Sequence, residues 1–220
     1  MSNRQRIIDA TVELMNERGS AVGTTQLVEH LEISPGNLYY HFRNREEILT
    51  EVLTRLQLDL DDVLILEVDE APTPAQLAQV LIGGAKVLWQ YRFFFSSSIE
   101  LVAQDKSLTD RYRQFCERGT AQVRTILTHL LASPAGAQKL KKSEINKLAE
   151  ILWVLWTSWP RYAEILAGKE GSEQQILRNH ESLELALKPY LEPKFYKAVV
   201  AKTRTLHEQP DSSVSTAIRY

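Results

Sequence analysis

The stretch that decides the fold is GTTQLVEHLEISPGNLYYHFRNREEIL, residues 23–49. Its apolar residues recur at the three- and four-residue spacing of short helices, with a break between the two groups. They are Leu27, Val28, Leu31, Ile33 and Leu38. The pattern predicts a helix over 25–31, a three-residue turn at 32–34 and a second helix that ends near Phe42. Two short helices joined by such a turn form a helix-turn-helix, whose second helix can enter the major groove of DNA.

Capping residues support these boundaries. Thr24 suits the N-cap of the first short helix, because its hydroxyl can accept a hydrogen bond from the free amides there. Ser34 suits the N-cap of the second helix, and Pro35 suits its first helical position. Asn44 is the expected cap of a third start, followed by acidic residues in the first turn. A long helix is therefore predicted from this point.

Outside this stretch the chain is also helical. An amphipathic helix precedes it and stops at Gly19, and the long helix after Asn44 ends before the proline pair in APTP, residues 71–74. Six more helices are expected, at 74–91, 93–103, 106–132, 143–167, 172–187 and 190–206. The sequence shows no convincing strand, so the fold class is all-α, with about nine or ten helices.

Three regions follow from this pattern. Residues 1–50 are expected to form a helix-turn-helix DNA-binding domain, which the long helix joins to a larger helical body. Residues 51–206 are expected to form this larger helical domain. Residues 207–220 are polar and lack helical patterning, which predicts a flexible tail.

The second helix of the motif carries the side chains suited to DNA. Gly36 allows close approach of the backbone, and Asn37 can contact bases or phosphates. Tyrosine, histidine and arginine side chains offer donors to phosphates. The hydroxyls of Thr25 and Ser34 stand beside helix N-terminal amides, which attract anions. The donors to phosphate are Tyr39, Tyr40, His41 and Arg45.

The residues TT, the apolar helix, SPGNLYYHF and RNREEIL together resemble the DNA-binding domain of the tetracycline-repressor (TetR/AcrR) family, from about Arg4 to Val52. The resemblance implies that Pro35, Gly36 and Asn37 face the bases. It also implies phosphate contacts from Thr25, Ser34, Tyr39, Tyr40, His41 and Arg45. In this family a basic or polar residue is more common at the position of Pro35. A van der Waals contact with a base is therefore the role expected of Pro35.

The charge distribution restricts how DNA is bound. The chain carries a net charge of −2, but residues 1–85 hold six arginines, no lysine and fourteen acidic residues, a net charge of −8. Non-specific affinity for DNA comes mainly from lysine and arginine that neutralise phosphates. The composition therefore argues against a protein that coats nucleic acid, and we expect binding through a few well-placed contacts.

The second body is rich in aromatic residues, which fill a core or line a ligand cavity; both readings are open. The resemblance implies a helical domain with an apolar effector pocket. The residues expected to line it are Trp89, Phe94, Ile99, Tyr112 and Phe115. Gly83 and Gly84 lack the spacing of a phosphate-binding loop and indicate close helix packing instead.

Residues 144–166 carry apolar side chains nearly all round the helix, so this helix must be covered on most sides. The resemblance implies that it joins a later helix near 177–187 in a four-helix bundle with a second chain, an isologous contact. The expected interface residues are Leu152, Trp153, Trp156, Trp159 and Leu183. A twofold dimer would place two recognition helices on pseudo-palindromic half-sites.

The leading hypothesis is a repressor that binds double-stranded operator DNA as a homodimer and is released by a small apolar or amphipathic effector. An activator, or a regulator controlled by a protein partner, stays open. A helical enzyme has little support, because no catalytic spacing is present; no catalytic residue, metal or cofactor is expected. The lone Cys116 indicates a reducing compartment. With neither a signal peptide nor an apolar span, a cytoplasmic protein without membrane contact is expected.

Overall fold

A computed structural model describes residues 2–64, 71–103, 105–167 and 173–208. Within these residues the chain forms eleven α-helices, one short 3₁₀ helix and no β-strand, which confirms the all-α fold. The first four helices are α1 (Asn3–Arg18), α2 (Thr24–Leu31), α3 (Pro35–His41) and α4 (Arg45–Leu64). They are followed by α5 (Pro74–Gln90), α6 (Arg92–Ser96), α7 (Ser98–Ala103) and α8 (Lys106–Ala132). The last are α9 (Lys142–Ala167), α10 (Glu173–Leu187), η1 (Lys188–Tyr190) and α11 (Pro193–Glu208).

Two predicted boundaries are wrong. The helix expected over 93–103 is two helices, α6 and α7, because Ser97 leaves the helical conformation between them. The last helix continues through Glu208, two residues into the expected tail. The rest of that tail, 209–220, lies outside the described residues.

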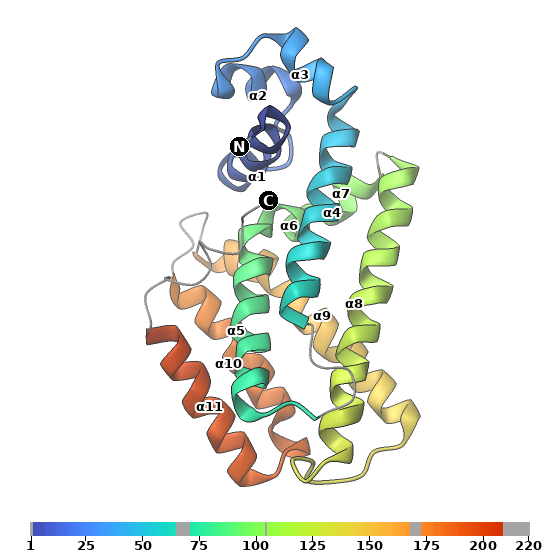
Figure 1. The fold of residues 1–220 in the computed structure, drawn as a ribbon, viewed down its shortest axis with the longest axis vertical. Helices are drawn as coiled ribbons and strands as arrows, with labels where there is room; N and C mark the ends of the chain where they lie inside the picture. The colour runs from blue at the N-terminus through green and yellow to red at the C-terminus, as the bar shows by residue number, and fades with distance from the viewer. Residues whose placement is uncertain (1, 65–70, 104, 168–172, 209–220) are drawn as a thin grey trace.

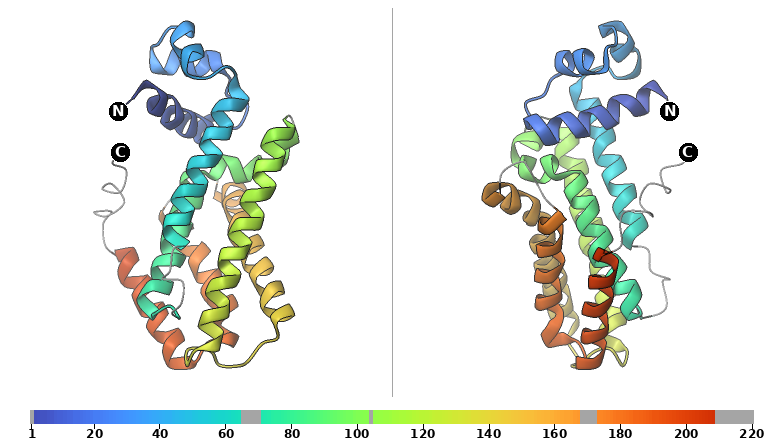
Figure 2. Two further views of the ribbon diagram at one scale, coloured as in Figure 1. Left: turned by 45° about the vertical axis from the view of Figure 1, so that its right-hand side comes forward. Right: turned by 90° about the vertical axis from the view of Figure 1, so that its left-hand side faces the viewer.

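The molecule is elongated, with α1, α2 and α3 at one end and the α8–α9 and α10–α11 connections at the other (Figure 1). At the far end these connections lie side by side. The Glu192 N–H donates to the Ala135 carbonyl over 2.8 Å, and the Ala137 N–H donates to the Tyr190 carbonyl over 2.9 Å. Figure 2 shows α4 running from the small N-terminal group of helices into the larger body. This helix of twenty residues is about 30 Å long.

The core is aliphatic at the N-terminal end and aromatic farther down. Ile7, Leu27, Leu38 and Ile48, from the first four helices, are fully buried together. In the larger body, two tryptophans of α9 lie against glycines of neighbouring helices. A Cβ built on Gly84 would lie 1.8 Å from Cζ2 of Trp156, and the Gly119 site meets Trp153 in the same way. The close packing expected at Gly84 is therefore present.

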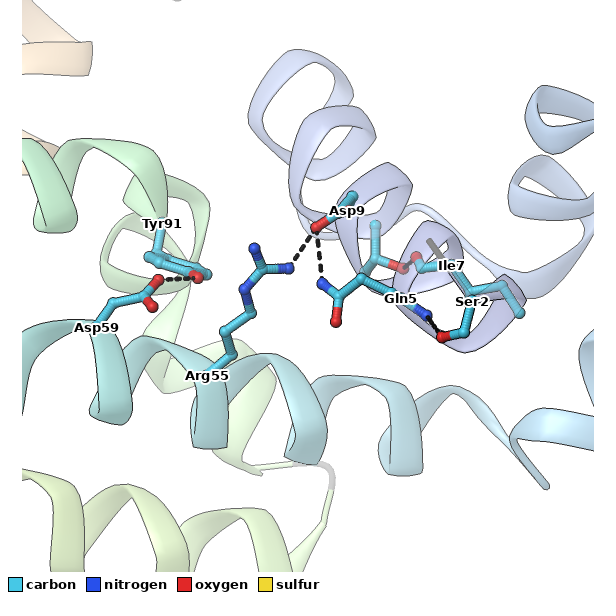
Figure 3. Close-up of polar contacts among 8 residues, drawn as sticks. Ser2, Gln5, Ile7, Asp9, Arg55, Asp59 and Tyr91 are labelled. Carbon is cyan, nitrogen blue, oxygen red and sulfur yellow. Dashed lines mark hydrogen bonds and ion pairs between the residues drawn. The ribbon is translucent and has the colours of Figure 1, made fainter. Parts of the chain in front are cut away.

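Polar contacts join the N-terminal helices to the larger body. The Asn16 side chain on α1 donates to the Gln90 carbonyl over 2.7 Å and accepts from the Phe93 N–H over 3.1 Å. Arg55 on α4 pairs with Asp9 on α1, and the Tyr91 hydroxyl donates to Asp59 over 2.6 Å (Figure 3). Since Asn16 is itself buried, these contacts fix how α1 sits on α5 and α6.

Candidate nucleic-acid interface and internal cavity

The turn between α2 and α3 has the predicted length. Glu32 adopts the left-handed conformation, with φ of 53°, and directs the chain into α3. The Ser34 hydroxyl accepts from the Asn37 N–H over 3.2 Å, and Pro35 occupies the first helical position. This cap is the predicted one. Because Leu38 is buried against Leu27, the opposite side of α3 is turned to solvent.

The cap of α2 differs from the prediction. Gly23, not Thr24, precedes the helix, and its N–H donates to the Gln26 side chain over 2.7 Å. Thr24 is instead the first helical residue, and its hydroxyl lies 3.5 Å from that of Tyr39. Threonine and glycine are about equally good N-caps, so propensity does not choose between them, and the Gln26 side chain, which accepts from the Gly23 N–H, favours Gly23.

Most of the proposed DNA-contacting residues lie on exposed parts of α2, α3 and their turn. Tyr40 is the most exposed of them, with 84% of its surface accessible. Its ring meets that of half-buried His41 edge to face, with centroids 5.0 Å apart. The other exposed members are Thr25, Ser34, Pro35, Gly36 and Tyr39, whereas Asn37 is half-buried. The structure thus presents these side chains on one short segment.

Arg45 also has a structural role that the sequence analysis did not identify. Its guanidinium donates to the backbone carbonyls of Val22, over 2.9 Å, and of Ser20. These bonds attach the connection between α1 and α2 to the start of α4. The helix dipole makes a cation unfavourable in the first turn of a helix. The arginine at the start of α4 goes against this preference, which was a sign in the sequence that Arg45 has another partner.

Three of the aromatic residues expected to line a ligand pocket pack on one another. Tyr112 stacks on Phe94 and on Phe115, with centroid separations of 5.7 and 5.9 Å. Burial in this cluster raises the pKa of Tyr112 to about 12. Ile99 is 75% exposed, and Trp89 lies beneath the guanidinium of Arg92. The rings of Phe94, Tyr112 and Phe115 pack on one another, and the ligand pocket expected at these residues stays a prediction.

An apolar cavity of about 40 Å³ lies elsewhere, between α4, α5, α8, α9 and α10. Its described lining consists of Trp156 and aliphatic side chains. The aliphatic residues are Leu64, Leu77, Val80, Leu81, Val123, Ile126, Leu127, Leu130, Leu152, Leu183 and Leu187. Leu64 is the last residue of α4, so the helix that leaves the α2–α3 motif ends at this cavity.

The predicted dimer residues lie mostly inside the single chain, and their part in a dimer interface stays a prediction. Four of the five, Leu152, Trp153, Trp156 and Leu183, are buried within a single chain and leave almost no surface for a second one. Trp159 is half-buried. The exposed apolar side chains of α9 are on another side of the helix, at spacings of three, four and eight residues. They are Ile151, Val154, Tyr162, Ile165 and Leu166, with Leu185 on α10.

None of the described helices is long and apolar enough to cross a membrane. The described residues contain no group of three or more histidine, cysteine, aspartate and glutamate side chains placed to hold a metal ion.

Two family models match this chain. Residues 7–52 match the model of bacterial regulatory proteins of the tetR family, and residues 55–199 match the TetR model of bacterial transcriptional repressors. Their boundary lies within α4, between the helix-turn-helix and the larger body.

Solved structures share the fold. A TetR-family transcriptional regulator from Marinobacter aquaeolei VT8 is 26% identical, with a TM-score of 0.82 over 93% of this chain and 98% of that chain. A transcriptional regulator from Aquifex aeolicus VF5 is 20% identical, with a TM-score of 0.57 over 84% and 99%. A ketosteroid transcriptional regulator of Mycobacterium tuberculosis is 15% identical, with a TM-score of 0.56 over 87% and 96%. The chain belongs to the TetR family of bacterial DNA-binding transcriptional regulators.

Proposed function

We propose that this regulator is a homodimeric repressor that leaves its operator when a small apolar molecule enters the cavity of the larger body. One observation carries the proposal: α4 begins next to the α2–α3 motif and ends with Leu64 in the cavity wall. A tilt of about 5° moves the far end of a helix about 30 Å long by about 2.6 Å. That displacement is close to the donor–acceptor distance of a hydrogen bond, so it suffices to misplace α3 in the major groove of DNA.

The size of the cavity indicates that a ligand enters only if the lining helices move apart. Its volume of about 40 Å³ exceeds that of one water but is below the 150 Å³ or so of a cavity that holds benzene. A ligand must therefore displace the lining helices, and differential affinity for the displaced state is what shifts a two-state equilibrium.

The exposed apolar side of α9 supports the dimer. Ile165, at 71% exposure, is the most exposed large aliphatic residue of this helix. Exposed apolar patches of this kind mark interaction sites in soluble proteins. A second copy that covers this side would form an isologous contact and place two α3 helices on one operator.

DNA selection tests the first part. Purified full-length protein is incubated with a random duplex library, and the bound sequences are expected to share a pseudo-palindrome. On the selected operator, Tyr40→Ala is expected to lower affinity at least about tenfold, since exposed tyrosine donors bind phosphate. His30→Ala is the control, because His30 is exposed on α2 outside the proposed contacts. Unchanged affinity in Tyr40→Ala, or no selected sequence, would contradict the proposal.

A further inference from the structure

A groove lies between the last turns of α8 and the start of α9, at the end of the molecule opposite α3 (Figure 1). Its volume is about 390 Å³, within the range of about 300–1,000 Å³ that is usual for small-molecule sites. It shares no described lining residue with the cavity of about 40 Å³. An inference about this groove therefore does not depend on the effector site proposed above.

The ionisable side chains that line this groove are all basic. They are Arg124 and His129 on α8 and Lys142 on α9. Among the described residues, none of these three forms an ion pair with an aspartate or glutamate. The sequence explains the excess, since residues 118–143 hold five lysines and arginines and no acidic residue. Glu144 follows, but its carboxylate accepts from the Lys141 N–H over 2.7 Å and does not line the groove. A groove lined by one sign of charge concentrates anions.

The walls of the groove supply apolar contact, and its charged groups belong to its rim. Ile145 is a half-buried wall residue. The Thr125 and Thr128 hydroxyls already donate to carbonyl oxygens of α8, over 3.1 and 2.8 Å, so their hydrogens are not available to a ligand. Arg124 and Lys142 are exposed. Such side chains lay their aliphatic stems along a wall and keep their charged ends in water.

A second copy bound to the exposed apolar side of α9 would leave this groove open. Nine residues separate Lys142 in the groove from Ile151 on that apolar side. Nine residues are about two and a half turns of an α-helix, so the two side chains leave α9 in opposite directions. The groove is therefore accessible to a small molecule in the proposed dimer as well as in the single chain.

We propose that this groove binds an organic dianion with a small apolar body, such as an aryl phosphate monoester. The body lies against Ile145, and the phosphate group sits at the rim, where the Arg124 guanidinium and the Lys142 ammonium balance its two charges. Both side chains bind phosphate oxygens, arginine through two parallel N–H donors. An uncharged molecule of the same shape leaves both cations without a partner, and free phosphate leaves the apolar wall uncovered.

The experiment compares three probes that separate the charge from the apolar body. Phenyl phosphate carries both, inorganic phosphate carries only the charge, and benzyl alcohol carries only the body. Each is titrated into full-length protein at about pH 8, where a phosphate monoester holds two charges, and binding is measured by isothermal titration calorimetry. We expect phenyl phosphate to bind at least about tenfold more tightly than either of the others, because the charge contact and the burial of the ring both contribute.

Two variants locate the ligand in the groove. Arg124→Gln and Lys142→Gln are each expected to weaken the binding of phenyl phosphate at least about fivefold, the scale of one exposed charge contact. Their matched controls are Arg113→Gln on α8 and Lys147→Gln on α9, which remove the same charge from the same helices outside the groove. The controls should bind like the native protein. All four residues are exposed, so the variants are expected to fold.

Three results would overturn the proposal. Equal affinity of the native protein for phenyl phosphate and benzyl alcohol would show that charge plays no part, and this result needs no variant. An equal loss in the groove variants and in their controls would show a general attraction of anions to a positive surface. Displacement of phenyl phosphate by a random DNA duplex whose binding also weakens in Arg124→Gln would assign the groove to a nucleic-acid backbone instead.

Discussion

At the scale of single residues, two glycines determine where the tryptophans of α9 lie. Gly84 on α5 and Gly119 on α8 leave room for the rings of Trp156 and Trp153. Because these glycines have no Cβ atoms, the side of α9 that carries the two tryptophans can pack against α5 and α8. The packing of this side also determines which apolar side chains of α9 remain exposed and available to a partner.

Gly84→Ala is expected to destabilise the protein. Alanine has the higher helix propensity by about 1 kcal/mol, but overpacking a core costs about 1–3 kcal/mol. The new Cβ would stand 1.8 Å from a buried ring, which places the overpacking cost at the upper end of that range, so we expect a net loss of about 2 kcal/mol. Urea denaturation measures it. Gly36→Ala is the control, because a Cβ there meets only the Ser34 hydroxyl at 3.9 Å; equal stability of both variants would refute the packing argument.

Glu184 gives the protein a predictable response to pH. Burial raises the pKa of its carboxyl above the ordinary glutamate value, which the hydroxyl of Thr203 partly offsets by donating to it. Glu181 raises this pKa, Arg204 lowers it, and the Nε2 atom of His180 lies 4.0 Å away. Because the folded state binds the proton more tightly than the unfolded chain, stability falls as pH rises from the ordinary glutamate pKa through the raised one.

Glu184→Gln is therefore expected to flatten the fall in stability over this pH window and to be the more stable form at neutral pH. Unfolding in urea between pH 4 and pH 8 checks this. Glu29→Gln, at an exposed position on α2, is the control and should retain the native profile, because Glu29 is not among the groups that shift the pKa of Glu184. A native-like fall in the Glu184→Gln profile would assign the pH dependence to another group.

At the scale of elements, the caps were the most predictable feature. Ser34 and Asn44 start α3 and α4 as the sequence indicates, because a cap is decided by its own side chain and the next three residues. The break at Ser97 lies within the three successive serines of residues 96–98, and this polar interruption between two apolar runs was a local signal for it. The inner side of α9 could not be foreseen, because Trp153 and Trp156 pack on glycines 34 and 72 residues earlier in the chain.

For the same reason, the helix-turn-helix segment was predictable and the cavity was not. Residues 23–49 form a local motif with its own turn and caps. The cavity wall combines side chains from five helices, and no periodicity distinguishes Leu77 in that wall from Phe94 in the aromatic cluster. Contacts distant in sequence leave no local pattern.

Asn44→Ala is expected to weaken the start of α4. The Asn44 side chain accepts from the Glu47 N–H over 2.9 Å, and the loss of such a cap costs about 1 kcal/mol. Thermal unfolding followed by circular dichroism measures this loss. Asn44→Asp should restore most of it, because aspartate is an equally good cap. Failure of aspartate to restore stability would show that Asn44 acts through something other than its acceptor.

At the scale of the whole molecule, Asn16 connects the two parts. Asn16→Ala leaves the Phe93 N–H and the Gln90 carbonyl without this partner, which is expected to cost about 2–3 kcal/mol. Hydrogen exchange should show the Phe93 amide losing protection, while the Leu38 amide, inside the N-terminal domain, exchanges at its native rate. Loss of protection at both amides would instead indicate general unfolding.

The dimer has its own test. Ile165→Lys places a charge on the exposed side of α9 and is expected to give monomers in sedimentation equilibrium. Operator affinity should fall at least about 100-fold, because two linked half-sites bind with avidity. Leu58→Lys, at an exposed position on α4, should stay dimeric. A dimeric Ile165→Lys variant would place the interface elsewhere.

The cavity at the end of α4 also bears on how this protein can change over evolutionary time. An unfilled volume of about 40 Å³ corresponds to about 1 kcal/mol of forgone stability. A substitution that enlarges Val80 or Val123 would recover part of it and close the space that a signal molecule needs. Selection for thermal resistance and selection for inducibility therefore act on the same few side chains in opposite directions. A lineage that adapts to heat by filling this cavity would therefore lose its response to the signal molecule while it keeps its fold.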